Sequence, residues 1–331
     1  MIAAMERRAF ITLLGGTAMW PLAAGAQQSP SRPLIGVISP LSSDGAARNT
    51  NAFRSGLRDL GYEEGRNIMI EFRYAEGVVA RLPDLATELV ARKPAVIVAG
   101  SVPAAMAAHN ATRAIPLVVS VSEDPVALGL AASLARPGGN VTGFSIEGDE
   151  TLNGKRLQLL KDAVPTLSRV GIILNPDDAG DAAKLKTFPS AARALSVTIS
   201  VLEVRSPADL DNAFAVALNE GLHGLYVSES PWFNSRRVEI VGMAARSRLP
   251  AVYGFREFTV AGGLMSFATS LPDVYRRKAG LVDKILKGES ASDLPFERPT
   301  KFELVVNLKT AKALGLTISE PFLLTADEVI E

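Results

Sequence analysis

Short apolar runs alternate with amphipathic runs along this chain, and the alternation constrains the fold more than any other feature. Residues 34–38, 95–98 and 170–174 contain only apolar side chains and glycine. Such continuous runs are typical of strands that are buried on both faces of a parallel sheet. Residues 81–92, in contrast, place apolar side chains at the three- and four-residue spacing of a helix. The pattern predicts an α/β fold in which helices cover both faces of each sheet.

The alternation occurs twice. In the first half of the chain, we expect strands and helices in turn at residues 34–38, 51–60, 67–73, 81–92, 95–98, 103–111 and 115–119. A linker-like stretch that contains proline and glycine follows at residues 135–140. In the second half, we expect helices and strands in turn at residues 152–163, 170–174, 182–195, 197–202, 210–219, 224–227, 238–245 and 250–253. The sequence therefore predicts two α/β lobes of similar plan, joined in series.

The C-terminal segments are too few to form a core of their own. Residues 263–267 and 302–306 are strand-like, and residues 275–287 are helical. We expect them to complete the two sheets, so that the chain crosses between the lobes more than once. The predicted architecture is two doubly wound parallel-sheet lobes joined by a multi-crossing hinge, which suits closure on a ligand. The predicted bounds are 33–142 plus about 268–298 for the N-terminal lobe, and 143–267 plus about 299–331 for the C-terminal lobe.

Residues 1–26 have the pattern of an export signal peptide. Arg7 and Arg8 form a positive start, residues 9–18 form a short apolar run, and small residues end at Ala24-Gly25-Ala26, an A-x-A cleavage pattern. The apolar run is shorter than the about 20 residues that a membrane-spanning helix needs. Cleavage after Ala26 predicts a mature protein in the periplasm. The paired arginines fit the twin-arginine route as well as the Sec route, and a retained membrane anchor is a third alternative.

Composition excludes several classes of function. The 331 residues include no Cys and 2 His, and 35 Lys and Arg balance 35 Asp and Glu. Without Cys there are no disulfides, no thiolate metal sites and no Cys nucleophile. The balanced charge argues against a nucleic-acid binder, which carries a basic patch. We therefore expect no metal, no cofactor and no nucleic-acid partner.

Polar residues follow the carboxyl ends of the expected strands in both lobes. Ligands of open parallel sheets bind beyond these ends, where helix N-termini offer free N–H groups. The candidate ligand-binding residues are Ser42, Ser101, Asp124, Asn175 and Ser228, with Tyr253 as an aromatic neighbour at the last strand. Each polar residue could alternatively serve only as a helix cap, and the tyrosine only as packing. Because both lobes present such a set at the same end, the sequence favours a ligand-binding cleft.

Motifs for catalysis are absent or incomplete. The chain has neither the G-x-x-x-x-G-K-[ST] nor the G-x-G-x-x-G motif, and residues 143–147 lack the second glycine of a nucleophile elbow. His109, late in a helix, and His223, at the start of a strand, lie away from the predicted cleft. The basic run Arg276-Arg277-Lys278 is expected to face solvent. These features predict a protein that is not an enzyme.

Several longer motifs resemble one family. They are residues 7–16 of the signal, residues 123–126, 135–145 and 253–258 and, most specifically, residues 299–312. On these motifs, the chain resembles an ABC-transporter substrate-binding protein of the type 1 periplasmic-binding fold, in the group related to tryptophan and aromatic-amino-acid binders. The resemblance covers essentially the whole chain. The chain departs from the family's pattern at Ser122-Glu123, where a glycine commonly precedes the Asp-Pro pair, so the family's ligand is not transferred by name.

The resemblance implies that a small-molecule ligand is captured between the lobes and delivered to an ABC permease with its ATPase at the inner membrane. It implies ligand contacts from Ser42, Ser101, Asp124, Asn175, Ser228 and Tyr253. We expect a monomer that binds a small polar or zwitterionic molecule, such as an amino acid or an aromatic acid, with a carboxylate at the helix N-terminus near Ser101-Val102. The alternatives are a periplasmic two-lobed enzyme and a ligand-sensing subunit for a membrane receptor.

Overall fold

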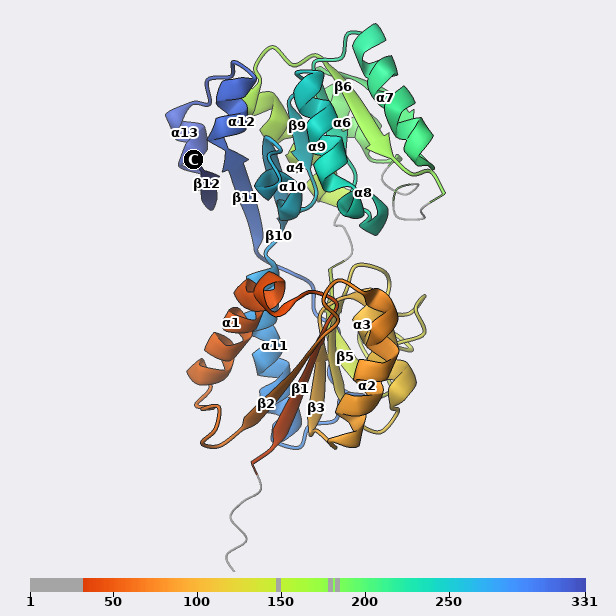
Figure 1. Cartoon of the computed structure of the whole chain (residues 1–331), viewed down its shortest axis with the longest axis vertical. Helices are drawn as coiled ribbons and strands as arrows, with labels where there is room; N and C mark the ends of the chain where they lie inside the picture. The colour runs from red at the N-terminus through yellow and green to blue at the C-terminus, as the bar shows by residue number, and fades with distance from the viewer. Residues whose placement is uncertain (1–31, 147–149, 178–180, 182–184) are drawn as a thin grey trace, which may run out of the picture. The chain divides into compact units, whose positions relative to one another are not determined.

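The strands form two separate sheets (Figure 1). The computed structural model describes residues 32–146, 150–177, 181 and 185–331, so the predicted export signal lies outside the described residues. The first sheet has the order β2-β1-β3-β4-β5, with strands β1 (Leu34–Ser39), β2 (Met69–Tyr74), β3 (Val96–Ala99), β4 (Leu117–Val121) and β5 (Val141–Ser145). The second has the order β12-β11-β10-β9-β8-β6-β7, with strands β6 (Arg169–Leu174), β7 (Thr198–Glu203), β8 (Gly224–Val227), β9 (Ala251–Tyr253), β10 (Met265–Thr269), β11 (Phe302–Asn307) and β12 (Glu328–Ile330).

Strand pairing is parallel throughout the first sheet. In the second sheet, the strands from β7 to β10 are also parallel. Strand β11 pairs antiparallel with β10, and β12 pairs parallel with β11. The prediction of two α/β lobes built on parallel sheets is confirmed, and the second sheet carries an antiparallel edge in addition.

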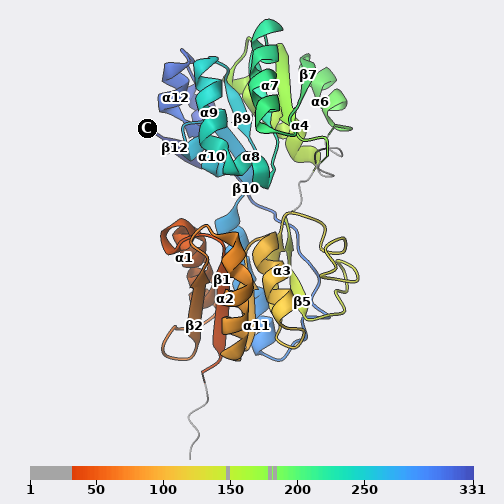
Figure 2. The ribbon, with the colours of Figure 1, turned by 45° about the vertical axis from the view of Figure 1, so that its right-hand side comes forward.

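Helices cover both faces of each sheet (Figures 1 and 2). In the first lobe, α2 (Leu82–Ala91) and α3 (Val102–Ala111) pack together on one face, and α1 (Ser43–Asp59) and α11 (Leu271–Leu286) pack together on the other. In the second lobe, α4 (Glu150–Ala163) and α6 (Phe188–Leu195) cover one face, and α7 (Pro207–Asn219) and α9 (Arg237–Arg246) cover the other. The remaining short helices are η1 (Val79–Arg81), α8 (Pro231–Ser235), α10 (Arg256–Val260), α12 (Leu308–Ala313) and α13 (Glu320–Leu323).

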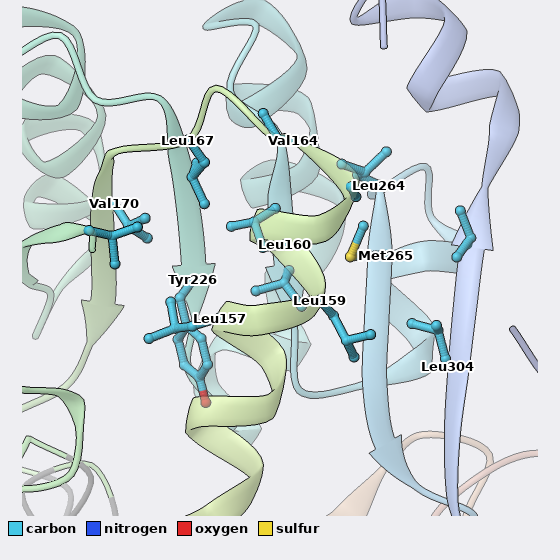
Figure 3. Packing of buried hydrophobic residues seen from close by; sticks show 14 of the residues in the cluster. Leu157, Leu159, Leu160, Val164, Leu167, Val170, Tyr226, Leu264, Met265 and Leu304 are labelled. Atoms are coloured by element: carbon cyan, nitrogen blue, oxygen red, sulfur yellow. The ribbon is translucent and has the colours of Figure 1, made fainter. Parts of the chain in front are cut away.

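Each sheet face has its own apolar core. Figure 3 shows one of them, in which Leu157 and Leu160 of α4 lie over Tyr226 and Met265 of the second sheet. Complete burial of a leucine side chain contributes about 1.5–3 kcal/mol. Because such cores lie on both faces, the strands are held firmly, and the loops at their carboxyl ends start from fixed positions.

The order of the described helices and strands takes the chain between the two sheets three times. It leaves the first sheet after β5, returns to it after β10 through α11, and joins the second sheet again at β11. Helix α11 packs on α1, so this C-terminal helix belongs to the first lobe. Strands β10, β11 and β12 belong to the second.

The predicted linker at residues 135–140 does not join the lobes, because β5 follows it and pairs with β4 in the first sheet. Thr142 of β5 also donates a hydrogen bond to the Leu294 carbonyl at 2.8 Å. Strand β5 runs to Ser145 and strand β10 to Thr269, so the predicted bounds at 142/143 and 267/268 fall within strands. We propose that the lobe boundaries lie after Ser145 and after Thr269.

Helix α1 begins earlier than the apolar pattern predicts. It starts at Ser43 rather than near residue 51, because the Ser42 side chain caps it there. The apolar pattern did not reveal this start, because the first two turns of the helix are mostly polar. The predicted helix at 182–195 is observed as α6 from Phe188, and residues 182–184 lie outside the described residues. Among the described helices, none is long and apolar enough to cross a membrane.

Candidate functional site

Three of the predicted site residues lie at the carboxyl edge of the first sheet. Ser42 follows β1 and caps α1, with its Oγ accepting from the Gly45 N–H at 3.1 Å. Ser101 follows β3 and caps α3, with its Oγ accepting from the Ala104 N–H at 3.3 Å. Asp124 follows β4, and its Oδ1 accepts from the Val126 N–H at 2.9 Å. All three side chains stay partly exposed; Ser42 and Ser101 cap helices, whereas Asp124 stabilises a turn.

Two further predicted residues, Asn175 and Ser228, come together in the second lobe through Asp181. The Asn175 N–H donates to Asp181 Oδ2 at 2.9 Å. The Ser228 hydroxyl donates to Asp181 Oδ1. Asp181 is fully buried, and sequence analysis missed it because it stands between glycine and alanine residues in a segment with no apolar periodicity. One buried carboxylate therefore fixes the loops after β6 and β8 relative to each other.

Tyr253 lies in the core of the second lobe. Its side chain is 1% exposed, and its ring stacks on Phe258 with centroids 4.6 Å apart. A Cβ at Gly263 would stand 2.5 Å from the same ring, so the glycine makes room for it. Burial raises the pKa of the Tyr253 hydroxyl above its ordinary value. The structure thus shows a packing role for Tyr253, and ligand contact stays a prediction.

A buried arginine that sequence analysis overlooked lies beside the β8 loop. Arg156 of α4 is fully buried; its Nε donates to the Phe267 carbonyl at 2.6 Å and its Nη1 to the Tyr226 hydroxyl at 3.0 Å. Its Nη2 pairs with Glu229, which directly follows Ser228. Desolvation lowers the pKa of Arg156, but the Glu229 carboxylate outweighs it, so the guanidinium stays charged. A sequence signal existed, because Arg156 stands four residues before the buried Leu160, on the inner face of the helix.

The basic run on α11 does not face solvent throughout, which corrects the sequence-based expectation. Arg276 is exposed and pairs with Asp59 at 2.6 Å. Lys278 is fully buried, and its Nζ donates to the Ala99 carbonyl at 2.8 Å. Its ammonium lies 4.1 Å from the centroid of the Tyr275 ring. The reason is helical spacing, since Lys278 continues a buried stripe of α11 that also includes Tyr275 and Val282.

Arg277 and Glu303 hold the segments that join the lobes. Arg277 donates to the Arg298 carbonyl and to Thr300 Oγ1, each at 3.2 Å, and pairs with Glu297. Glu303 at the start of β11 pairs with Arg48 of α1 at 2.9 Å and accepts from the Ser270 hydroxyl. These polar contacts connect α1, α11 and β11 near the points where the chain changes sheet.

The two histidines lie where the sequence places them, away from the carboxyl edges. His109 is in the last turn of α3, and burial lowers its pKa. His223 directly precedes β8, where its Nδ1 lies 3.1 Å from the Ser168 hydroxyl. No group of three or more His, Asp or Glu suited to a metal occurs in the described part of the chain.

A cavity of about 240 Å³ lies at the opposite end of the first lobe, where α1 ends and β2 begins. It is lined by Arg54, Leu57, Arg58, Tyr62, Glu63, Glu64, Ile68 and Ile70. None of the predicted ligand-binding residues lines it, so it is separate from the candidate site.

Comparison with known proteins agrees with the two-sheet α/β fold. The family model described as "ABC transporter substrate binding protein" matches residues 34–330. A protein from Clostridioides difficile (strain R20291) named "Tyrosine-binding protein" is 27% identical over 283 residues, which cover 85% of this chain and 81% of that protein.

Solved structures match over nearly the whole chain. An ABC domain from Streptococcus pneumonia in complex with L-Trp superposes with a TM-score of 0.73 at 24% identity, over 91% of this chain and 100% of that one. The ligand-free, open structure of a substrate binding protein with adhesive properties from Clostridium difficile gives a TM-score of 0.74 at 24% identity, over 90% of this chain and 99% of that one. At this identity, the structural matches establish the fold.

Proposed function

Because the chain belongs to the family of ABC transporter substrate binding proteins, we propose that it captures a small polar organic solute between its lobes and releases it unaltered. The observation that carries this proposal is the extent of the family match, which takes in both sheets. Capture by closure needs a ligand that contacts both lobes and so favours the closed state. Polar loops at the carboxyl edges of both sheets would supply such contacts, and the capped helices after Ser42 and Ser101 and the loop held by Asp181 support this.

Aromatic amino acids are the first candidates for the ligand. Support comes from the relative named as a tyrosine-binding protein and from the similar fold that holds L-Trp. A zwitterion also suits loops that combine helix N-termini with carboxylates, since the former attract carboxylates and the latter attract ammonium groups.

The proposed ligand-binding set combines three residues from each lobe. Ser42, Ser101 and Asp124 would contribute from the first lobe. Asn175 and Ser228, both fixed by Asp181, would contribute from the second. Tyr253 would contribute only if the loop after β9 opens, because its ring is buried.

The wider role follows from the family. We propose that residues 1–26 direct export to the periplasm, by the Sec or the twin-arginine route, and that the mature protein acts as a monomer. It would deliver its ligand to an inner-membrane permease and ATPase. No catalytic step is proposed.

Calorimetry and thermal shift test the function directly. The purified mature protein is titrated with L-tyrosine, L-tryptophan, L-phenylalanine, benzoate and glucose. We expect one-to-one binding of at least one aromatic amino acid, and a ligand at 100 times its Kd adds about 2.7 kcal/mol of stability. An Asp181→Asn variant should weaken binding by freeing the two loops, while Asp211→Asn, an exposed position of α7, should not. Chemical conversion of any of these compounds by the protein, with no stable binding of the unaltered compound, would contradict the proposal.

A further inference from the structure

Lys278 carries a buried amine, and no anionic side chain among the described residues pairs with it. Its side chain is fully buried, with one hydrogen bond to the Ala99 carbonyl and the Tyr275 ring beside it. Among the described residues, no carboxylate lies within 4.0 Å of its Nζ. Burial of an uncompensated charge costs several kcal/mol. A methionine would fill the same space without that cost, so packing alone does not account for the lysine.

The ammonium lies directly beneath a ligand-edge loop. Ala99 is the last residue of β3, and Gly100 and Ser101 follow it before α3 begins. Tyr275 supports the same loop, because a Cβ at Gly100 would stand 1.6 Å from its hydroxyl oxygen. Two side chains of α11 therefore set the position of the β3–α3 loop, and of the two only Lys278 can become positively charged.

The same loop ends in a helix N-terminus that has a free donor. The Ala104 and Ala105 N–H groups bond to Ser101, and Pro103 has no N–H. The Val102 N–H has no carbonyl within the helix to reach. A ten-residue helix places partial positive charge here, and Lys278 would add a full charge from below once it is protonated. Both features favour an anion at this loop.

We propose that Lys278 is a positioning residue that makes the β3–α3 loop selective for the carboxylate of the ligand. The proposal rests on the proposed function and names the part of the ligand that the first lobe recognises. Lys278 does not contact the ligand; it orients the loop through Ala99, and its charge is balanced by the carboxylate when the ligand is bound. Burial holds the pKa of Lys278 well below its ordinary value, so a bound carboxylate should bring a proton onto the amine.

The surroundings leave Lys278 as the group that would take up this proton. Strands β3, β4 and β5, which pack against α11, carry no ionisable side chain. Tyr275 and Tyr74 influence each other, and burial raises the pKa of Tyr275 to about 12. The charged groups of α1 are Asp44, Arg48, Arg54, Arg58 and Asp59. The other charged groups on α11 are Asp273, Arg276, Arg277, Asp283 and Lys284.

The test compares L-tyrosine with L-tyrosinamide, which lacks the carboxylate, in the wild type, Lys278→Met and Lys284→Met. Lys284 is an exposed lysine of the same helix and serves as the matched control. We expect Lys278→Met to weaken tyrosine binding at least tenfold and amide binding less than threefold, with no change for Lys284→Met. In two buffers of different ionisation enthalpy, the wild type should take up protons on binding tyrosine, and Lys278→Met should not. Equal weakening for both ligands, or none, would overturn the proposal.

A second arm does not depend on the amino acid. Sodium acetate is added to protein labelled with ¹³C at lysine Cε, and the Lys278 resonance, assigned by its loss in Lys278→Met, is followed with pH. Acetate should raise the titration midpoint of Lys278; an unchanged midpoint overturns the proposal. If the wild type binds no aromatic amino acid but acetate shifts Lys278, the proposed ligand class fails and the carboxylate site stands.

Discussion

Replacing Arg156 by methionine tests whether the buried ion pair organises the second lobe. Methionine keeps an unbranched apolar stem in α4 but removes every donor of the guanidinium. Three partners lose the hydrogen bond that Arg156 donates to them: the Phe267 carbonyl, the Tyr226 hydroxyl and the Glu229 carboxylate. Of these, the carboxylate is the most costly to leave without its cation.

The size of the effect follows from the burial of each partner. Breaking a buried ion pair from one side costs about 3–5 kcal/mol. Arg156 is fully buried, whereas the Glu229 side chain is 19% exposed, so water partly solvates the carboxylate that remains. We therefore expect Arg156→Met to lower the free energy of unfolding by about 3 kcal/mol, near the lower end of that range. At about 2–4 °C per kcal/mol, the melting temperature should fall by at least about 6 °C.

Urea denaturation followed by circular dichroism measures the loss, with Arg156→Met, Glu229→Gln and the double variant compared in one cycle. The single losses should not add, because the second substitution acts on a pair that is already broken; the coupling energy should exceed about 1 kcal/mol. Arg193→Met, an exposed position on α6, is the matched control and should change stability by no more than about 0.5 kcal/mol. A loss below about 1 kcal/mol for Arg156→Met, or additive single effects, would refute the reasoning.

Three further outcomes follow from the same geometry. Burial lowers the pKa of Lys278, so the amine binds a proton more readily in the unfolded chain than in the folded protein. The stability of the wild type relative to Lys278→Met should therefore fall as pH decreases from about 10. A difference in urea midpoint that stays constant between pH 7 and 10 would contradict this. Gly143 has φ +149° and leaves only 2.0 Å between an added Cβ and the Val119 carbonyl, so Gly143→Ala should cost about 3 kcal/mol or prevent folding, and an unchanged melting temperature would count against it. Ser101→Asp should keep the α3 cap and the stability but weaken tyrosine binding more than tyrosinamide binding. If the substitution weakens the binding of both ligands by the same factor, the anion site is disproved.

The buried strands were the part of the fold most open to prediction. Strands β3, β6 and β8 consist of apolar residues with little else, because helices cover both faces of their sheets. Strand β5 was missed because its sequence, Val-Thr-Gly-Phe-Ser, is short and carries two hydroxyls and a glycine. The buried Thr142 satisfies its hydroxyl on a carbonyl some 150 residues away, which local pattern cannot reveal.

In the candidate site, too, the residues with local contacts could be predicted and those with distant partners could not. Ser42 and Ser101 could be placed because capping is local, involving a side chain and an amide three residues later. Asp181, Arg156 and Lys278 could not, because each bonds to a group far along the chain: Ser228 is 47 positions from Asp181, and Ala99 is 179 positions from Lys278. Local pattern alone assigns such charged residues to the surface, as it did for Lys278.

Arg156 and Lys278 lie on either side of the crossing from β10 to α11. Arg156 holds the Phe267 carbonyl in β10, just before the crossing, and Glu229 in the loop after β8. Lys278 stands in α11, just after the crossing, and holds the Ala99 carbonyl at the end of β3. Apolar residues of similar volume often stabilise a fold as well as buried charges do, so stability alone is a poor explanation for both. What the two share is a link between the crossing and a loop at the carboxyl edge, one in each lobe. Each of the two side chains therefore ties one side of the crossing to a loop at the carboxyl edge of its own sheet.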